Sequence, residues 1–97
     1  MKAIRKPQLT PLGKGVSIKT LQVTGLSGMI MPPHHSTKEA VIVVLEGQAL
    51  LKMPGSKHLL KEGFSFIIPA GEEHTLTIQQ DFKAIAIMAV DSEINFD

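Results

Sequence analysis

The sequence contains no cysteine, no tryptophan and no tyrosine, and only four phenylalanines. Disulfides and thiolate metal sites are therefore excluded, and the composition is compatible with a reducing compartment, so we expect a cytoplasmic protein. The shortage of aromatic rings argues against a platform for stacking bases or sugars. The longest apolar run, Ala40 to Leu45, is far shorter than the ~20 residues of a membrane helix. The basic start is not followed by an apolar segment, so we expect neither a signal peptide nor a membrane partner.

Charge of either sign is also scarce and evenly spread. Ten basic residues face nine acidic ones, for a formal net charge of +1. No basic stripe is present, so we expect no nucleic-acid partner. Hydrophobic residues make up 43% of this short chain, which favours a second subunit that covers part of the apolar surface. We expect a homodimer, with residues 1–12 as a possible edge or dimer segment.

Period-two alternation between closely spaced turns is the main structural signal. This pattern predicts an all-β fold, and 97 residues suit a single domain spanning residues 1–97. We expect chain breaks at Glu46-Gly47 and at Pro54 to Lys57, and a last hairpin turn at Gln80-Asp81. The expected strands are residues 15–24, 29–31, 40–45, 48–53, 58–60, 64–68, 75–79 and 83–90.

One segment has the order of a strand, a tight turn and a histidine that begins the next strand. Gly63, Pro69, Gly71 and His74 occur at the spacing of the second motif of the cupin superfamily, and the motif's final asparagine position is occupied by Ile78. The turn glycines suit positions that need positive φ or close packing. Residues 63–78 thus resemble a small single-domain cupin. The resemblance implies an antiparallel jelly-roll (double-stranded β-helix) barrel.

A second segment, residues 28–47, resembles the first motif of the same superfamily. Gly28, His34 and Gly47 stand at the motif's spacing. In metal-binding cupins, two histidines and a glutamate of this motif join the second-motif histidine around a divalent metal. The resemblance therefore implies a possible Zn, Fe, Mn or Ni site. With Gly28 and Gly47 as anchors, the four ligand positions are occupied by His34, Ser36, Ala40 and His74.

A register shifted by one residue gives a different set of ligands. It would place Pro33, His35, Glu39 and His74 at the four positions and needs one extra residue, such as a bulge, before Gly47. Neighbouring strand residues point to opposite faces, so His34 and His35 cannot both face inward in a regular strand. The candidate metal ligands are therefore His34, His35, Glu39 and His74, and the register decides among them.

The walls of the expected pocket follow from the same parity argument. If His74 points inward, so do the residues at even spacing along its strand and along the strand that begins at Ala40. A pocket with a few histidines and aliphatic walls suits a small, largely apolar ligand. Three functions remain open: a barrel that binds a small molecule, a metal-dependent dioxygenase or isomerase, and a purely structural or oligomerising barrel. The expected pocket residues are Ser36, Ala40, Ile42, Val44, Leu76 and Ile78.

Overall fold

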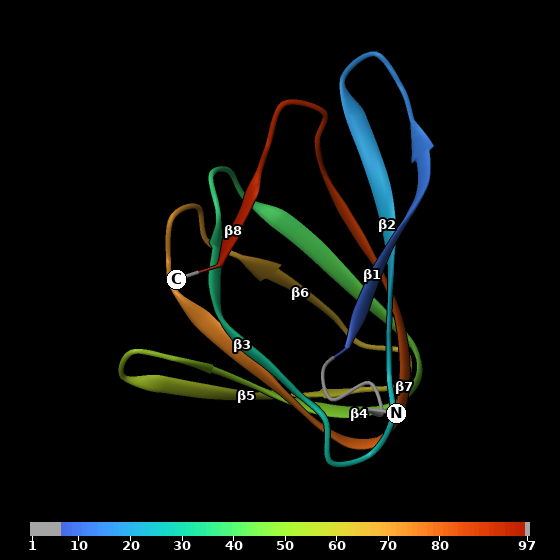
Figure 1. Ribbon diagram of the computed structural model, residues 1–97, viewed down its shortest axis with the longest axis vertical. Helices are drawn as coiled ribbons and strands as arrows, with labels where there is room; N and C mark the ends of the chain where they lie inside the picture. Colours follow the sequence, from blue (N-terminus) through green and yellow to red (C-terminus); the bar gives the residue numbers. More distant parts are fainter. Residues whose placement is uncertain (1–6, 97) are drawn as a thin grey trace, which may run out of the picture.

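The computed structural model describes residues 7–96, and all of their regular structure is β-strand. The strands curl into a barrel with antiparallel pairing throughout (Figure 1). This is the jelly-roll architecture that the alternation and the motifs predict, and it is confirmed. The strands are β1 (Gln8–Lys14), β2 (Ile18–Gly25), β3 (Ile30–Ser36), β4 (Ala40–Met53), β5 (Ser56–Lys61), β6 (Ser65–Ile68), β7 (His74–Ala89) and β8 (Ile94–Phe96).

Two long strands, β4 and β7, run through both layers of the barrel. The second half of β7 pairs with β2, whereas its first half pairs with β3. Strand β4 pairs with β7 along both halves, and also with β6 through its first half and β5 through its second. The first layer thus has the order β1-β2-β7-β4-β6, and the second has the order β8-β3-β7-β4-β5.

The passage from one layer to the other lies at Gly47. Gly47 has φ 81°, and a Cβ atom built on it would stand 1.9 Å from the carbonyl oxygen of Asp81. Only glycine can occupy this position, because any side chain would overlap the backbone of β7. The register of the β4–β7 pair shifts at Glu46 and Gln48, on either side of Gly47. The strands therefore bend here and continue.

Two sequence predictions are corrected by this bend. Both the break at Glu46-Gly47 and the hairpin turn at Gln80-Asp81 are wrong, because each lies inside a continuous strand. The polar and glycine residues that read as turn signals mark the place where two paired strands change layer together. Close approach of two backbones calls for the same residue types as a chain reversal.

Strands β1 and β8 form edges that the sequence reading did not predict as strands. Strand β1 lies partly within the segment 1–12 and pairs with β2 of its own chain; residues 1–6 are outside the described part. Strand β8 pairs with β3. Both are mostly exposed, so they lack the alternation that reveals a half-buried strand.

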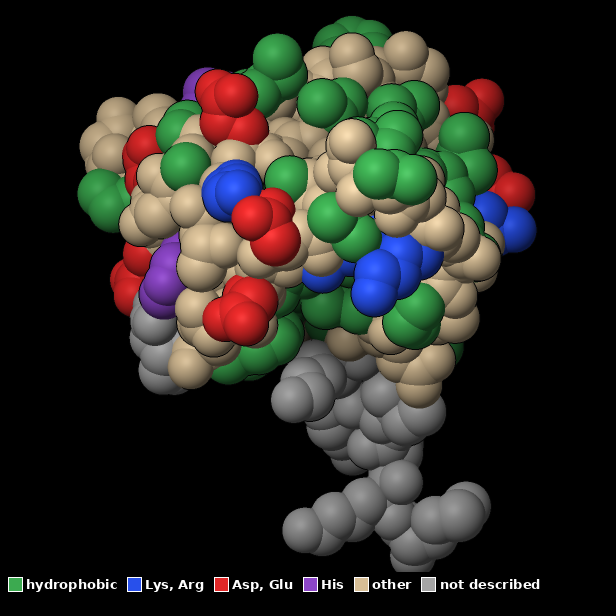
Figure 2. All heavy atoms as spheres, turned by 90° about the horizontal axis from the view of Figure 1, so that it is seen from above, with side chains coloured by type: hydrophobic (Ala, Val, Ile, Leu, Met, Phe, Trp, Pro, Cys, Tyr) green, Lys and Arg blue, Asp and Glu red, His purple; other side chains and the backbone are tan. Residues whose placement is uncertain are grey.

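The barrel end that carries the β1–β2 hairpin exposes apolar side chains. Val16 in the connecting turn is 97% exposed and Leu12 in β1 is 53% exposed. Figure 2, a view onto this end, shows hydrophobic side chains gathered over one half of the face, with acidic side chains more frequent on the other half. In the described residues no helix is long and apolar enough to cross a membrane.

Candidate functional site

A cavity of about 60 Å³ lies between the two layers. Its walls are mostly aliphatic and come from both layers. A buried water needs about 10–15 Å³ of such space, so the cavity has room for about four to six atoms of water size. Three polar side chains join this lining: His34 and Ser36 from β3, and His74 from the start of β7. The apolar walls include Met31, Ile42, Leu51, Ile68, Leu76 and Met88.

The inward direction of His34 results from a bulge in β3. Met31 pairs with Leu76 and His34 pairs with His74, so β3 uses three residues where β7 uses two. The extra residue falls at Pro32-Pro33, where proline supplies no N–H for regular pairing. After the bulge, alternation is regular: His34 and Ser36 are buried, whereas His35 is only partly buried.

The turn before β7 places His74 beside His34. Gly71 has φ 72°, and its N–H donates to the carbonyl oxygen of Ser36 over 2.8 Å. This hydrogen bond fixes the Pro69–Gly71 turn to β3, and three residues later the chain enters β7 with His74 facing inward. The two imidazole rings lie edge to face with centroids 4.1 Å apart. The ring of Phe96 in β8 also lies near His34, with ring centroids 5.1 Å apart.

The hydrogen bonds of the two histidines fix their tautomers. Nδ1 of His34 lies 2.7 Å from the carbonyl oxygen of Pro32, and Nδ1 of His74 lies 3.0 Å from that of Glu72. A carbonyl oxygen only accepts, so in both rings Nδ1 must carry the proton. In a neutral ring, Nε2 is then the nitrogen with the lone pair. In each case the accepting carbonyl belongs to the residue two positions earlier in the chain. Each ring is therefore oriented by its own local backbone.

Burial favours the neutral form of His74. Desolvation lowers the pKa of His74 below its ordinary value of 6.5, and the electrostatic influence of the neighbouring His35 acts in the same direction. The hydrogen bond to the Glu72 backbone and the negative charge of Glu72 oppose that shift without cancelling it. The neutral imidazole is therefore the form that this cavity stabilises at neutral pH.

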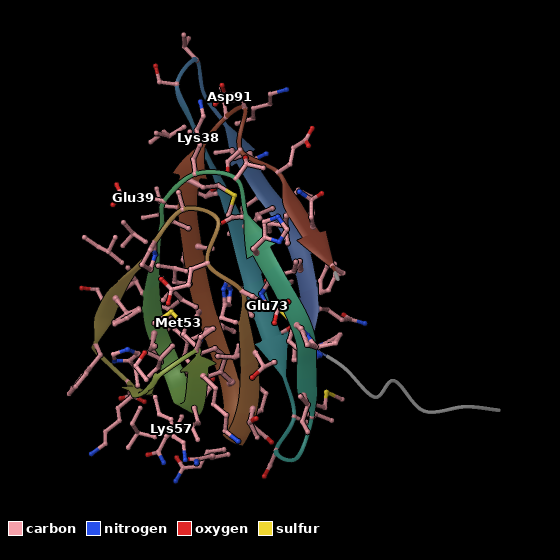
Figure 3. The ribbon with its side chains drawn as sticks, turned by 90° about the vertical axis from the view of Figure 1, so that its left-hand side faces the viewer. Lys38, Glu39, Met53, Lys57, Glu73 and Asp91 are labelled. Atoms are coloured by element: carbon pink, nitrogen blue, oxygen red, sulfur yellow. The ribbon has the colours of Figure 1, made fainter. Side chains whose placement is uncertain are left out.

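The other candidate site residues separate into three groups. Ser36, Ala40, Ile42 and Leu76 line the cavity with the two histidines. Val44 and Ile78 are buried in the core, at 2% and 1% exposure, but they do not line the cavity. Glu39 is exposed and lies on the outer side of the barrel (Figure 3).

Some lining residues were not found by sequence reasoning. Leu9 belongs to β1 and Ile94 to β8, the two strands that alternation did not reveal. Ala86 alternates with partly buried isoleucines on β7, so strict parity from Met88 would have identified it. Leu51 and Ile68 follow the same rule on β4 and β6 once the bend at Gly47 is known.

The lining residues do not fit a resident divalent metal that is bound by three or more side chains. Within residues 7–96, no group of three or more His, Cys, Asp or Glu side chains is arranged to hold a metal ion. The cavity offers two imidazoles and a serine hydroxyl, whereas His35 and Glu39 do not line it. The bulge precedes His34, so it produces the register of β3 that brings Ser36 inward, and Ala40 at the start of β4 also lines the cavity. The one-residue shift needed for a Glu39 ligand is not formed.

Comparison with known proteins agrees with the geometry. Residues 22–90 match the family model described as "Cupin domain". No curated protein matches the sequence. A cupin superfamily protein from Desulfitobacterium hafniense shares 16% identity at a TM-score of 0.79, covering 94% of this chain and 84% of that one. An uncharacterised double-stranded β-helix protein from Klebsiella pneumoniae has a TM-score of 0.81 at 14% identity, covering 100% and 90% of the two chains.

An enzyme also occurs among the similar structures. A DMSP lyase from Ruegeria pomeroyi superposes with a TM-score of 0.83 at 20% identity, and the match covers 94% of this chain but 51% of the lyase. Identities this low establish a common fold and not a common reaction. The family match extends over more than half of the chain and contains both histidines of the cavity. The chain belongs to the cupin family.

Proposed function

We propose that this cupin binds a small molecule in the cavity between its layers, without a resident metal. The observation that supports this most directly is the composition of the cavity wall. Two imidazoles and a hydroxyl, all from β3 and the start of β7, adjoin otherwise apolar walls around a cavity of about 60 Å³. Binding sites for small molecules have this form, with apolar walls and a few oriented polar groups.

The burial of two histidines in this cavity lowers the stability of the protein without a ligand. Polar groups are expensive to bury, even when part of their hydrogen-bonding capacity is satisfied. His34 and His74 are 7% and 5% exposed, and aliphatic side chains at these positions would fill the space without that cost. Bound ligand would recover the polar interactions and fill the cavity.

The methionines of the chain allow a direct test of binding. Met31 and Met88 line the cavity, whereas Met53 lies near the β4–β5 hairpin, away from it (Figure 3). In protein with 13C-labelled methionine methyl groups, small alcohols, ketones and acids of about four to six heavy atoms are titrated in turn. Binding in the cavity shifts the Met31 and Met88 signals and leaves the Met53 signal in place.

A matched pair of variants on β7 locates the binding. Ala86→Ile fills the cavity, whereas Ala89→Ile makes the same change on the partly buried outer side of the strand. We expect the first variant to abolish the Met31 response and the second to retain it. Overpacking costs about 1–3 kcal/mol, so thermal melts confirm that both variants are folded. Absence of any response in the wild-type protein would refute the proposal.

Elemental analysis distinguishes the metal-free site from a metal centre. Protein purified without chelator, with His74→Ala alongside, is measured by inductively coupled plasma mass spectrometry. We expect much less than one equivalent of Zn, Fe, Mn or Ni in both samples. One equivalent that disappears in His74→Ala would contradict the metal-free proposal and favour the metal-dependent one.

We also propose that two copies associate through the outer face of the first layer. Six side chains of this face, here named the outer patch, are apolar and partly or fully exposed. Adjacent rows run Thr20–Ile87–Val41–Ile67 and Gln22–Ile85–Val43–Ser65 across β2, β7, β4 and β6, without a charged residue. The outer patch consists of Ile18, Val41, Val43, Ile67, Ile85 and Ile87.

Charge and size favour a second copy as the occupant of the outer patch. A twofold interface places like against like, so an uncharged centre avoids repulsion. The pair Lys38–Asp91 lies beyond one end of the rows and the pair Lys83–Glu46 lies at the bend beyond the other, so each of these charges has an opposite charge beside it. Four strands at ~4.8 Å and six residues at ~3.4 Å span roughly 400 Å², about half of what each partner of a stable interface buries. Flanking side chains would supply the remainder.

A pair of lysine substitutions tests the interface. Ile87→Lys places a charge in the centre of the outer patch, whereas Ile30→Lys makes the same change at a residue of β3 that is 52% exposed and outside it. Sedimentation velocity at micromolar concentration should show a dimer for the wild-type protein and for Ile30→Lys, and a monomer for Ile87→Lys. A monomeric wild-type protein would contradict the proposal.

A further inference from the structure

The three polar side chains of the cavity share one property: each directs its hydrogen-bond donor to a backbone carbonyl. The Ser36 hydroxyl donates to the carbonyl oxygen of Lys38 over 3.0 Å. Nδ1–H of His74 donates to the Glu72 carbonyl, and Nδ1–H of His34 donates to the Pro32 carbonyl. These carbonyls belong to the local chain, so the donors are engaged before any ligand arrives.

The remaining hydrogen-bonding capacity of His74 and Ser36 is therefore accepting. A neutral imidazole with its proton on Nδ1 has only a lone pair on Nε2, and a hydroxyl that has donated its proton retains oxygen lone pairs. The acceptors that His74 and Ser36 offer are complementary to a ligand that brings its own donor.

The charge of the lining residues further restricts the chemical class of the ligand. Among residues 7–96, those that line the cavity include no Asp, Glu, Lys or Arg. A carboxylate would place its acceptor oxygens against other acceptors, and an ammonium would be buried without a counter-charge. An uncharged hydroxyl can donate to an acceptor of the cavity without this cost.

We propose that the cavity selects a small neutral alcohol, with its O–H donating to Nε2 of His74 or to Oγ of Ser36 and its alkyl part against the aliphatic walls. This inference rests on the proposed binding function and defines its ligand class. The cavity volume of about 60 Å³ suits a small ligand of about four to six heavy atoms.

Three probes of five heavy atoms each test the selectivity. Butan-1-ol has the donor, methyl propyl ether lacks it, and propionate replaces it with a charged acceptor. Dissociation constants come from the Met31 and Met88 methyl shifts at pH 7.5. We expect butan-1-ol to bind about tenfold more tightly than the ether, as one hydrogen bond allows, and propionate to bind most weakly.

Variants identify the acceptor that receives the hydroxyl proton. His74→Phe keeps an aromatic ring and removes the lone pair, so the advantage of the alcohol over the ether should fall while affinity for the ether is retained. If His74→Phe does not fold, Ser36→Ala removes the other acceptor, and the alcohol–ether comparison in wild-type protein needs no variant.

The outcomes separate the two proposals. Equal dissociation constants for alcohol and ether would overturn the alcohol inference, and so would tighter binding of propionate than of butan-1-ol. In both cases the methyl shifts would still support a binding cavity. No methyl shift with any of the three probes would overturn both proposals.

Discussion

The inner and outer faces of the second half of β7, from Ala84 to Ile87, are both apolar but differ in side-chain size. On the second half of β7, Ala84 and Ala86 point inward and alternate with Ile85 and Ile87 on the outside. Ala84 is 0% exposed, whereas the isoleucines are only partly buried. Small inward residues leave space between the layers, and large outward residues present a surface that water does not favour. This alternation of small and large side chains on β7 therefore contributes to both the cavity, through Ala86, and the outer patch, through Ile85 and Ile87.

The largest predicted effect concerns the residue that allows both strands to bend between layers. Gly47→Ala would place a methyl group 1.9 Å from the Asp81 carbonyl oxygen, so β4 and β7 must separate at the bend. We expect a loss of at least ~4 kcal/mol in unfolding free energy, or failure to fold. Chemical denaturation and circular dichroism measure this loss.

A second glycine provides the control for Gly47. Gly55 in the β4–β5 hairpin also has positive φ, at 80°, but a Cβ atom there would meet nothing within 4 Å. Gly55→Ala therefore tests backbone strain without overlap, and we expect a loss of about 1 kcal/mol. Equal losses in the two variants would show that close approach of the strands at Gly47 contributes nothing.

The next largest predicted effect comes from a comparison of an inward and an outward leucine of β4. Leu51 is 1% exposed and lines the cavity, whereas Leu45 on the same strand is 45% exposed. Leu51→Ala should lower the unfolding free energy by about 2–5 kcal/mol because it enlarges a space in the core. Leu45→Ala should cost less than about 1 kcal/mol. Similar losses, measured by urea denaturation, would contradict the assignment of the two faces.

The sequence predicts the barrel well because its signals are local. Alternation on β2, β4, β6 and β7 and the turn glycines are each decided within a few residues, and together they indicate an antiparallel barrel. The bend at Gly47 is the exception, because whether a glycine reverses the chain or permits a close approach depends on Asp81, which is distant in sequence. The edge strands β1 and β8 carry too little burial to produce alternation.

The candidate site was harder to predict from the sequence than the fold. Motif spacing brings His34 and His74 into one cavity, and parity adds Ser36 and Ala40. The position of the bulge could not be predicted, because an extra residue at Pro32-Pro33 and one after His35 are both compatible with the sequence. The side chains of His34, His74 and Ser36 donate hydrogen bonds to backbone carbonyls, and no pattern of side chains in the sequence reveals these bonds.

The pH dependence of the unfolding free energy tests the burial of one inward histidine, His74. The pKa of His74 is lowered in the folded protein from an ordinary value of 6.5, so the unfolded chain binds more protons between the folded pKa and 6.5. Stability is therefore complete above pH 6.5 and falls as the pH drops through that window. The slope from one proton is at most ~1.4 kcal/mol per pH unit.

Urea denaturation of wild-type protein and His74→Phe at pH 7.5 and pH 5.5 measures this contribution. We expect the wild-type protein to lose stability between the two values and the variant to lose less. Equal losses would show that burial of His74 has no consequence for proton binding.

The smallest effect belongs to an outward polar pair, Lys38 and Asp91, which meet beside the end of β7 (Figure 3). Nζ of Lys38 donates to Oδ2 of Asp91 over 2.6 Å, and both side chains are more than half exposed. The hydrogen bond from Lys38 lowers the pKa of the Asp91 carboxyl below its usual 3.8, so its contribution is present above that value and is lost only in stronger acid. Exposed ion pairs contribute little because water and salt screen them. Asp91→Asn should therefore leave the melting temperature at pH 7 and 150 mM salt nearly unchanged. A decrease as large as that of Leu51→Ala would mean that this pair, and not the apolar interior alone, closes the end of the barrel.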